Sequence, residues 1–452
     1  MKKKYMFSTK RELFPVLTLE TDAAHKLLRK IKNRNLVLDD SIVSKVTSII
    51  KTVRSEGDAA LIKFTKRFDG VTLNQIKVPK EEIEEARAKA DKKFVDIISE
   101  AAAKVRKFHE KQKRNSWLEE DGDGTVLGQR IVPLDRVALY VPGGTAAYPS
   151  TVIMNAVPAQ AAGVRKIIVV TPPNKAGTST REHGTVNQLV LTTCGILGID
   201  NVYSIGGAQA VAAVAYGTES VQKVDKIVGP GNIFVAAAKK VVFGDVDVDM
   251  IAGPSEVVVL ADSTADPDEV AADLLAQAEH DCNAAAVLIT TDENLAHKVG
   301  ERIQSFLSKL SRKEIAAESL RRSGAAFVVS EISEAVDLVN EIAPEHLEIV
   351  ANNDMEILNC IKNAGAVFIG RYSPESVGDY FAGPSHVLPT GGTARFSSVL
   401  SVETFVKRSS VIRYSQKAFE RDSKKIQTLA ESEGLTAHSL SIKIRDKRER
   451  KR

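Results

Sequence analysis

The order of apolar and polar positions along the chain changes character at Arg136. Before it, over residues 40–114, apolar side chains recur at helical spacing, and two amphipathic helices open at Asp40 and at Pro79. Gly57 closes the first helix, whereas the second continues as one long, charge-rich segment. Because these helices bring no reactive side chains together, we interpret the block as scaffold.

After Arg136, short apolar segments alternate with helices rich in small residues. Strands are expected at 137–141, 166–170, 201–205, 226–228, 256–260, 285–289, 326–329 and 366–369. Such alternation implies parallel sheets with helices on their faces. Glycine turns at 142–144 and 253–255 divide the pattern into two α/β units, which leaves room for an internal duplication. Residues 172–187 form a polar loop in which His183 is expected to be exposed.

The helix that follows strand 256–260 has a clear start. Asp266 is its expected N-cap, Pro267 stands in the first turn, and Glu269 comes three residues after the cap. Residues three apart share one helix face, so this helix is expected to present Gln277 and His280 together.

Composition describes an ordinary soluble α/β protein. A chain of 452 residues can hold two or more domains. The sequence has no apolar run long enough for a bilayer, and its basic N-terminus lacks the apolar core of a secretory signal. A cytoplasmic location is therefore expected, and an organellar one stays open. The net charge of +4 and a basic tail without aromatic residues favour a solvated tail over nucleic-acid binding.

The cysteines indicate a reducing compartment. Only Cys194, Cys282 and Cys360 occur, widely separated and odd in number, which argues against a disulfide framework. Cys282 lies just past His280 and suggests a catalytic thiol. A small buried side chain near a helix end is the favoured interpretation.

Metal-competent side chains occur in separate segments. Gln277, His280, Asp379 and His438 offer nitrogen and oxygen ligands, a mixture that suits zinc or a similar divalent transition metal. Spacing alone cannot join Asp379 and His438 to the other two. On spacing alone, polar residues at a helix end remain the favoured interpretation of Gln277 and His280.

Two adjacent bases, Glu345 and His346, follow Pro344. We expect a helix to begin at this proline, so that the positive end of its dipole favours a carboxylate anion and a neutral imidazole. Both groups would then accept protons near pH 7, as general-base chemistry requires. A first-turn dipole partner beside a half-exposed histidine is the alternative, and these residues alone favour it.

Glycine-rich turns at 229–232 and 389–393 could approach a phosphate closely. Gly229 and Gly231 match the start of the dinucleotide fingerprint, but Phe234 stands where its third small residue belongs. By pattern alone, tight turns are the better interpretation.

Taken together, the ordered motifs resemble the histidinol dehydrogenase family along nearly the whole chain. The similarity is carried by the segments 139–144 (LYVPGG), 206–210 (GGAQA), 223–232 (KVDKIVGPGN), 252–256 (AGPSE), 276–281 (AQAEHD), 343–347 (APEHL), 386–395 (HVLPTGGTAR) and 433–438 (EGLTAH). So many ordered matches do not arise by chance.

The resemblance implies oxidation of L-histidinol to L-histidine through the aldehyde, with NAD and one zinc ion per subunit. It implies two Rossmann-like parallel-sheet domains with small N- and C-terminal arms, in an intertwined homodimer whose subunits share active sites. Glu345 and His346 match the catalytic pair. The matched zinc ligands are Gln277, His280, Asp379 and His438. All four, with His346, also match substrate contacts, as do Ser255, His386 and Glu433. The matched NAD contacts are Tyr140, Gln209 and Asn232.

The expected domain plan is discontinuous. Residues 1–35 form an arm, 36–135 with 257–395 a first α/β domain carrying the metal and catalytic residues, 136–256 the NAD-binding domain, and 396–452 a dimerisation tail. Two other functions stay open. One is a dehydrogenase of the same fold acting on another polar alcohol. The other, a silent scaffold or nucleic-acid binder, is disfavoured by the intact set of site residues.

Overall fold

The computed structural model describes residues 12–34, 39–143, 148–174 and 186–446. Gly144, His183 and most of the loop at 172–187, and the end of the basic tail, lie outside these residues. The chain divides into two units, of which the first comprises 1–112 with 135–405 and the second 113–134 with 406–452. Among the described helices, none is long and apolar enough to cross a membrane.

The first unit contains a five-stranded parallel sheet in the order β6-β5-β4-β7-β8. Relabelled by their order along the chain, these strands run third, second, first, fourth and fifth, which is the Rossmann order. The strands are β4 (Arg136–Tyr140), β5 (Lys166–Thr171), β6 (Val202–Ser204), β7 (Lys226–Val228) and β8 (Asp247–Val248).

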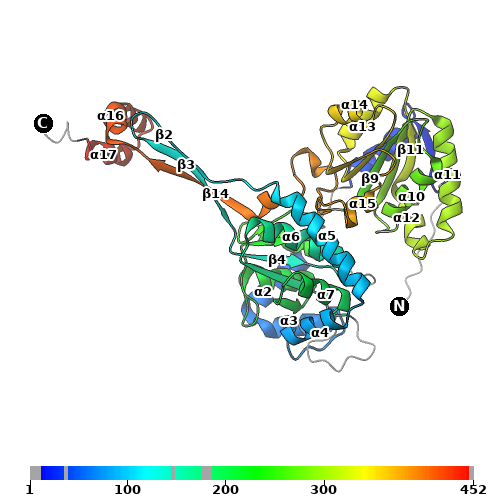
Figure 1. Ribbon diagram of the computed structural model, residues 1–452, viewed down its shortest axis with the longest axis horizontal. Coiled ribbons are helices and arrows are strands. Elements are labelled where there is room, and N and C mark those ends of the chain that lie inside the picture. Colours follow the sequence, from blue (N-terminus) through cyan, green and yellow to red (C-terminus); the bar gives the residue numbers. More distant parts are fainter. Residues whose placement is uncertain (1–11, 35–38, 144–147, 175–185, 447–452) are drawn as a thin grey trace. The chain divides into compact units, whose positions relative to one another are not determined.

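Helices cover this sheet on both faces (Figure 1). Side chains alternate between faces along a strand, so Ala138 and Tyr140 meet one helix layer, whose members are α2 (Asp40–Glu56), α3 (Asp58–Phe68), α8 (Gly207–Tyr216) and α9 (Ile233–Val242). The remaining helices pack on one another, α5 and α7 on α6 and α4 on α7. They are α4 (Lys80–Lys89), α5 (Lys92–Glu110), α6 (Pro149–Ala162) and α7 (Gln188–Ile196).

The helical block therefore differs from expectation in two ways. Asp91 accepts a hydrogen bond from the Phe94 N–H and starts α5 afresh, so the segment after Pro79 is two helices and not one. In addition, Val46 and Ile50 of α2 pack on the five-stranded sheet. The predicted domain plan joins 36–135 to 257–395. The helices of 36–135 instead bury their apolar faces against 136–256.

A second parallel sheet in the first unit has the order β1-β11-β10-β9-β12-β13. Without β1 at its edge, this order repeats the third-second-first-fourth-fifth arrangement, as the two predicted α/β units suggested. Its strands are β1 (Val16–Thr18), β9 (Glu256–Ala261), β10 (Ala285–Thr290), β11 (Gly324–Val328), β12 (His346–Val350) and β13 (Ala366–Ile369). Because β1 completes this sheet, residues 16–18 belong to the domain and not to a separate arm.

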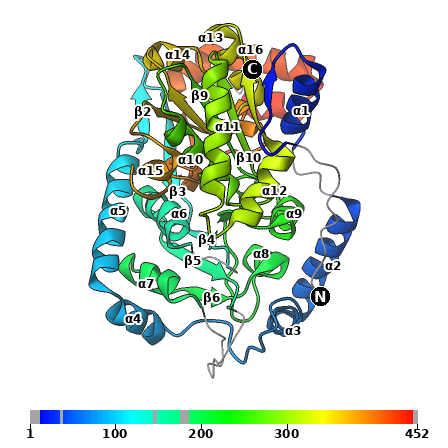
Figure 2. The same cartoon turned by 90° about the vertical axis from the view of Figure 1, so that its right-hand side faces the viewer.

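Both faces of the second sheet are buried (Figure 2). Val257 and Val259 point to α10 (Pro267–Ala278), α11 (Glu293–Leu307) and α12 (Lys313–Ser323). Val258 and Leu260 point the other way, to α1 (Asp22–Lys32), α13 (Ile332–Ile342) and α14 (Asp354–Cys360). The chain then forms α15 (Glu375–Tyr380) and two short 3-10 helices, η1 (Thr393–Arg395) and η2 (Val402–Phe405).

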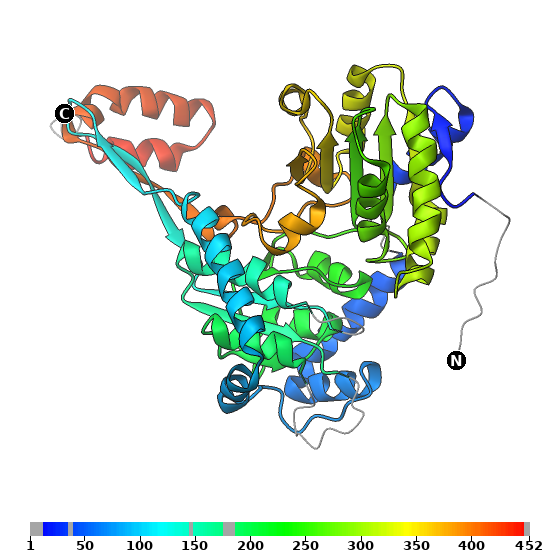
Figure 3. The same ribbon diagram turned by 45° about the vertical axis from the view of Figure 1, so that its right-hand side comes forward.

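The second unit is small (Figure 3), and many of its residues are exposed. Its antiparallel sheet has the order β14-β3-β2, and two helices pack on each other after it. These elements are β2 (Trp117–Glu120), β3 (Val126–Pro133), β14 (Val406–Arg413), α16 (Gln416–Ser432) and α17 (Thr436–Lys443). The C-terminal tail thus forms one sheet with residues 113–134. The predicted plan assigned those residues to the first α/β domain.

Candidate active site

Glu345 and His346 lie where the chain enters β12, and the expected helix at this point is wrong. Helix α13 ends at Ile342, and Ala343 takes a left-handed conformation with φ of 53°. Pro344 then leads into the sheet, where β12 pairs with β9 on one side and β13 on the other. A central parallel strand normally reads as an apolar run. In β12 charged residues interrupt the apolar run, so the strand was not predicted. Such departures from the local pattern are typical of functional positions.

The Glu345 carboxyl is buried within the protein, with 6% of the residue exposed. Burial raises its pKa well above the usual range, and the nearby Glu256 carboxylate raises it further. The predicted anionic form of Glu345 near pH 7, and the helix dipole given as its cause, are therefore both wrong for the protein without a bound cation. In the absence of a bound cation, Glu345 holds its proton more tightly than an exposed glutamate does.

His346 is neutral at physiological pH because burial lowers its pKa to about 3. Its Nδ1 lies 3.3 Å from the Glu256 carbonyl oxygen, so we assign the ring proton to Nδ1. Nε2 is buried, has no hydrogen-bond partner among the described residues, and lies 3.8 Å from Asp379 Oδ1. The predicted proton-accepting form of His346 thus agrees with this geometry, through burial and not through a helix dipole.

Beside His346, three side chains place ligand atoms within 4.8 Å of one another, namely His280, Glu375 and Asp379. Helix α10 ends at Ala278, so His280 lies in the turn after the helix and does not share a helical face with Gln277 as predicted. Burial raises the pKa of Asp379 to about 7. Two of these three residues were predicted from the sequence, and the structure brings them together.

Gln277 lies in the last turn of α10, three residues before His280. The residue is fully buried, and neither atom of its amide has a hydrogen-bond partner in the part of the chain that the structure describes. A buried amide without a partner costs free energy, on the order of 1–3 kcal/mol for each unsatisfied group. An imidazole, carboxylates and an amide oxygen fit a zinc-like divalent ion, so this donor set suits a metal.

Glu375 of this group was not predicted from the sequence. It is 3% exposed and its Oε1 lies 3.9 Å from His346 Nδ1. Burial raises its pKa well above the ordinary value, with Asp379 as the next cause. The available signal was its spacing, because residues four apart on one helix lie on the same face and Glu375 precedes Asp379 by four.

The buried Glu348 carboxyl contacts the first residue of α15 and lies close to the half-buried Asp273. Glu348 Oε1 accepts a hydrogen bond of 2.7 Å from the Glu375 N–H. Burial, and then the neighbouring Asp273, raise the pKa of Glu348 to about 8. A carboxyl whose folded-state pKa is raised binds more protons in the folded state, so its contribution to stability is complete below about pH 4.3 and is lost as pH rises toward 8.

Replacing Glu348 by Gln is therefore expected to stabilise the protein increasingly with pH. The amide keeps the acceptor for the Glu375 N–H but cannot ionise. The thermal midpoint of the variant, relative to the parent, should rise by several degrees between pH 5 and pH 8, since a few kcal/mol corresponds to such shifts. Exposed Glu356 provides the matched control. A constant difference across this range would contradict the argument.

The predicted cofactor residues gather at the carboxyl edge of the five-stranded sheet. Tyr140 ends β4, and its hydroxyl accepts a hydrogen bond of 3.0 Å from the Gly207 N–H at the start of α8. A Cβ at Gly229, after β7, would lie 2.3 Å from the Tyr140 carbonyl oxygen, so only glycine permits this approach. Strands β4 and β7 flank the switch point where Rossmann folds bind ligands.

Within this group, Tyr140 and Gln209 are buried, whereas Asn232 is exposed. The Asn232 side chain caps α9 by accepting hydrogen bonds from the N–H groups of Phe234 and Val235. A buried ion pair holds the turn before it, because Lys239 Nζ donates to the Gly229 carbonyl and pairs with Asp249.

The other predicted side chains divide between the two units. Ser255 hydrogen-bonds to the Glu345 carboxyl, and burial lowers the pKa of His386 to about 4, with His280 as a neighbouring charge. Cys282 is half-buried and not fully buried as favoured, and burial raises the pKa of its thiol, which opposes a thiolate nucleophile. Glu433 and His438 are exposed residues of the second unit, and their roles stay predictions.

Two Rossmann-ordered sheets and a buried group of bases are typical of an α/β enzyme. A family model described as histidinol dehydrogenase matches residues 32–446. The chain belongs to the histidinol dehydrogenase family and is thus an oxidoreductase.

Known relatives agree with this assignment. Histidinol dehydrogenase of Geobacillus kaustophilus strain HTA426 is 54% identical over 400 residues, covering 88% of this chain and 93% of the relative. The Bacillus subtilis strain 168 enzyme is 52% identical, covering 89% and 93%. The crystal structure of histidinol dehydrogenase from Elizabethkingia anophelis is 36% identical with a TM-score of 0.89, covering 97% of this chain and 99% of that one. This structural similarity confirms the predicted fold class.

Proposed function

We propose that the protein oxidises L-histidinol to L-histidine through L-histidinaldehyde, the last step of histidine biosynthesis, using zinc and two molecules of NAD. Family membership supports the dehydrogenase activity. The observation that carries the metal-assisted form is the unpartnered, fully buried amide of Gln277, one turn before His280 of the His280–Glu375–Asp379 group.

Gln277, His280 and Asp379 would hold the ion, with His438 as the fourth ligand. When bound, zinc would anchor the substrate nitrogens and favour the anionic form of nearby carboxyls such as Glu345. Anchoring makes the geometry nearly intramolecular, which is one of the larger contributions to enzymatic rates. Ser255, His386 and Glu433 are proposed as further substrate contacts.

The two bases have separate tasks. His346 accepts the hydroxyl proton at its free Nε2 when the carbinol is oxidised, and again when the aldehyde hydrate is oxidised. Glu345 takes a proton from water, which adds to the aldehyde carbon to form that hydrate. The burial of both side chains excludes bulk water from these proton transfers. Each oxidation delivers its hydride to NAD.

A homodimer with shared sites would place His438 at the metal of the partner subunit. The second unit exposes large apolar side chains over its sheet and helices, including Trp117, Leu118, Ile412, Leu429 and Leu440. Exposed apolar surface of this extent is typical of an interaction surface. A second copy of this chain is the proposed partner.

Asn232 offers a test of the NAD site, because Ala and Ser replacements separate its two roles. Serine can still cap α9, whereas alanine cannot, at a cost of about 1 kcal/mol in stability. Both should raise the KM for NAD about two- to tenfold if the amide binds the cofactor, since a typical hydrogen bond contributes about 0.5–1.5 kcal/mol. Thermal unfolding and NAD titration check this. An unchanged KM in the serine variant would contradict the contact.

The experiment that tests the function combines metal analysis with turnover. Purified protein should contain one zinc ion per subunit and form two NADH for each L-histidinol consumed. Replacing Asp379 by Asn should lower zinc content as well as activity. Zinc-loaded protein that leaves L-histidinol untouched but oxidises another polar alcohol would favour the alternative dehydrogenase of the same fold.

A further inference from the structure

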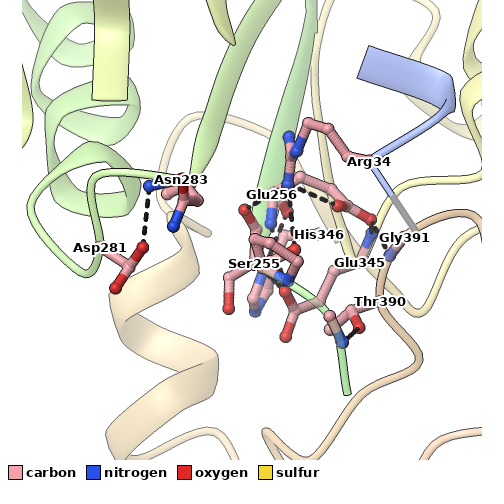
Figure 4. Close-up of polar contacts among 12 residues, drawn as sticks. Arg34, Ser255, Glu256, Asp281, Asn283, Glu345, His346, Thr390 and Gly391 are labelled. Atoms are coloured by element: carbon pink, nitrogen blue, oxygen red, sulfur yellow. Dashed lines mark hydrogen bonds and ion pairs between the residues drawn. The ribbon is translucent and has the colours of Figure 1, made fainter. Parts of the chain in front are cut away.

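Arg34 is a buried cation next to the candidate site that no step above uses. It follows α1, and its side chain is 8% exposed. A single nitrogen, Nη2, donates to the carbonyl oxygens of Pro254 and Ser255, each at 3.0 Å, and to Glu256 Oε2 at 3.1 Å (Figure 4). Arg34 therefore fixes both the turn that carries Ser255 and the carboxylate that follows it.

Glu256 passes this restraint on to Glu345. Its Oε1 accepts hydrogen bonds from the Glu345 N–H at 3.2 Å and from the Gly391 N–H at 2.9 Å. In return, Glu345 Oε2 accepts from the Glu256 N–H at 3.2 Å (Figure 4). The two glutamates are thus joined reciprocally, each carboxyl to the other's main chain, at the amino ends of the adjacent strands β9 and β12.

This arrangement needs a cation. Both carboxyls are buried and close in space, so two negative charges here would repel each other strongly without compensation. Arg34 is the charged side chain that attracts Glu256 in the described part of the chain, and it also acts on Glu345. Removing it would leave Glu256 as an uncompensated buried charge, which must take up a proton or turn away.

We propose that Arg34 and Glu256 are positioning residues. They hold the Glu345 carboxyl where it can take a proton from the water that adds to the aldehyde. This inference rests on the proposed function of Glu345. It adds to that function a residue of the N-terminal segment, outside the motifs of the matched site. Misplacement of a reacting group by about 1 Å can cost on the order of 10²-fold in rate.

The test first compares the two half-reactions in three variants. Arg34→Met should lower the rate of NADH formation from supplied L-histidinaldehyde about 10²-fold, while the first hydride transfer from L-histidinol in a single turnover falls less than about tenfold. Arg34→Lys should recover most of the lost rate, because a single donor nitrogen of Arg34 makes its contacts with Pro254, Ser255 and Glu256. Lys32→Met, two residues earlier in the same segment, removes a surface ion pair with Glu341 and is the matched control.

A double-mutant cycle adds a readout that general destabilisation would not give. If Arg34 acts through Glu256, then Arg34→Met with Glu256→Gln should be no slower in aldehyde oxidation than Arg34→Met alone, since the unpaired buried charge is gone. Independent effects would instead multiply. Should Arg34→Met not fold, Arg34→Lys and Glu256→Gln carry the test, with a selective loss in aldehyde oxidation expected for Glu256→Gln.

The outcomes distinguish a failure of the positioning role from a failure of the proposed function of Glu345. Equal losses in both half-reactions, multiplying losses in the cycle, or no loss at all would overturn the positioning role, while a selective loss in Glu345→Gln would leave the proposed function intact. If Glu345→Gln itself lacks a selective loss, the assignment of Glu345 fails and the positioning role fails with it.

Discussion

Replacing Glu345 by Gln is expected to lower the conversion of L-histidinaldehyde to L-histidine by about 10²–10⁴-fold, the range typical for the loss of a general base. Glutamine has nearly the same size and keeps an oxygen that can accept the Glu256 N–H. The structural disturbance should therefore be small. What is lost is the ability to take a proton from water, and oxidation of the alcohol should fall far less because His346 serves that step.

The measurement supplies each substrate separately. NADH formation from the aldehyde reports the second oxidation, and a single turnover with L-histidinol reports the first. Glu356→Gln, the same replacement at an exposed position of α14, controls for nonspecific effects. Equal losses in the two steps would mean that Glu345 does not have a role separate from that of His346.

Much of the fold could be predicted because the strands of both sheets are short apolar segments between glycine turns and amphipathic helices. Lys226–Val228 and Ala366–Ile369 have the predicted bounds. Strands β1, β8 and β12 were not predicted. In β12, His346 and Glu348 stand in place of apolar residues of a central strand, directly after Glu345. Their burial depends on partners from other strands and helices, which no local pattern contains.

Domain boundaries were harder to predict, because they too depend on contacts that the local pattern does not contain. An amphipathic helix such as α2 shows which face is apolar but not which sheet receives it. Val46 and Ile50 could equally have covered either parallel sheet. Likewise, β14 alternates weakly and its partner β3 lies far earlier in the chain, so their pairing had no signal in the local pattern.

Within the site, local spacing and the family motifs identified candidate ligands and bases. They did not identify the residues that support them. Arg34 lies 220 or more positions from the residues it contacts, and Glu256 looks like the first residue of an ordinary strand. The pKa of Glu345 also could not be foreseen, because burial and the Glu256 charge, not the local backbone, determine it.

The candidate residues use opposite edges of the two sheets. Tyr140 and Gly229 lie at the carboxyl ends of β4 and β7, where a Rossmann fold ordinarily binds its ligand. Glu256 and His346 instead begin β9 and β12, at the amino edge of the second sheet. The two domains thus share a strand order without sharing the position of their chemistry, so neither site could have been located from the fold of the other.

Mixing two inactive variants should restore activity if subunits share their sites. In dimers that combine His438→Asn with Glu345→Gln subunits, one of the two sites receives an intact Glu345 from one chain and an intact His438 from the other. Random pairing then makes about a quarter of all sites complete, so about a quarter of wild-type activity is expected from two nearly inactive samples.

The matched control mixes Glu345→Gln with His346→Ala. These residues are neighbours at the start of β12 and must act from the same chain, so mixed dimers contain no intact site and activity should stay at the level of the separate variants. Restoration in the first mixture and not in the second would assign His438 to the site of the partner subunit. If mixed dimers form but neither mixture recovers, the result would point to self-contained subunits.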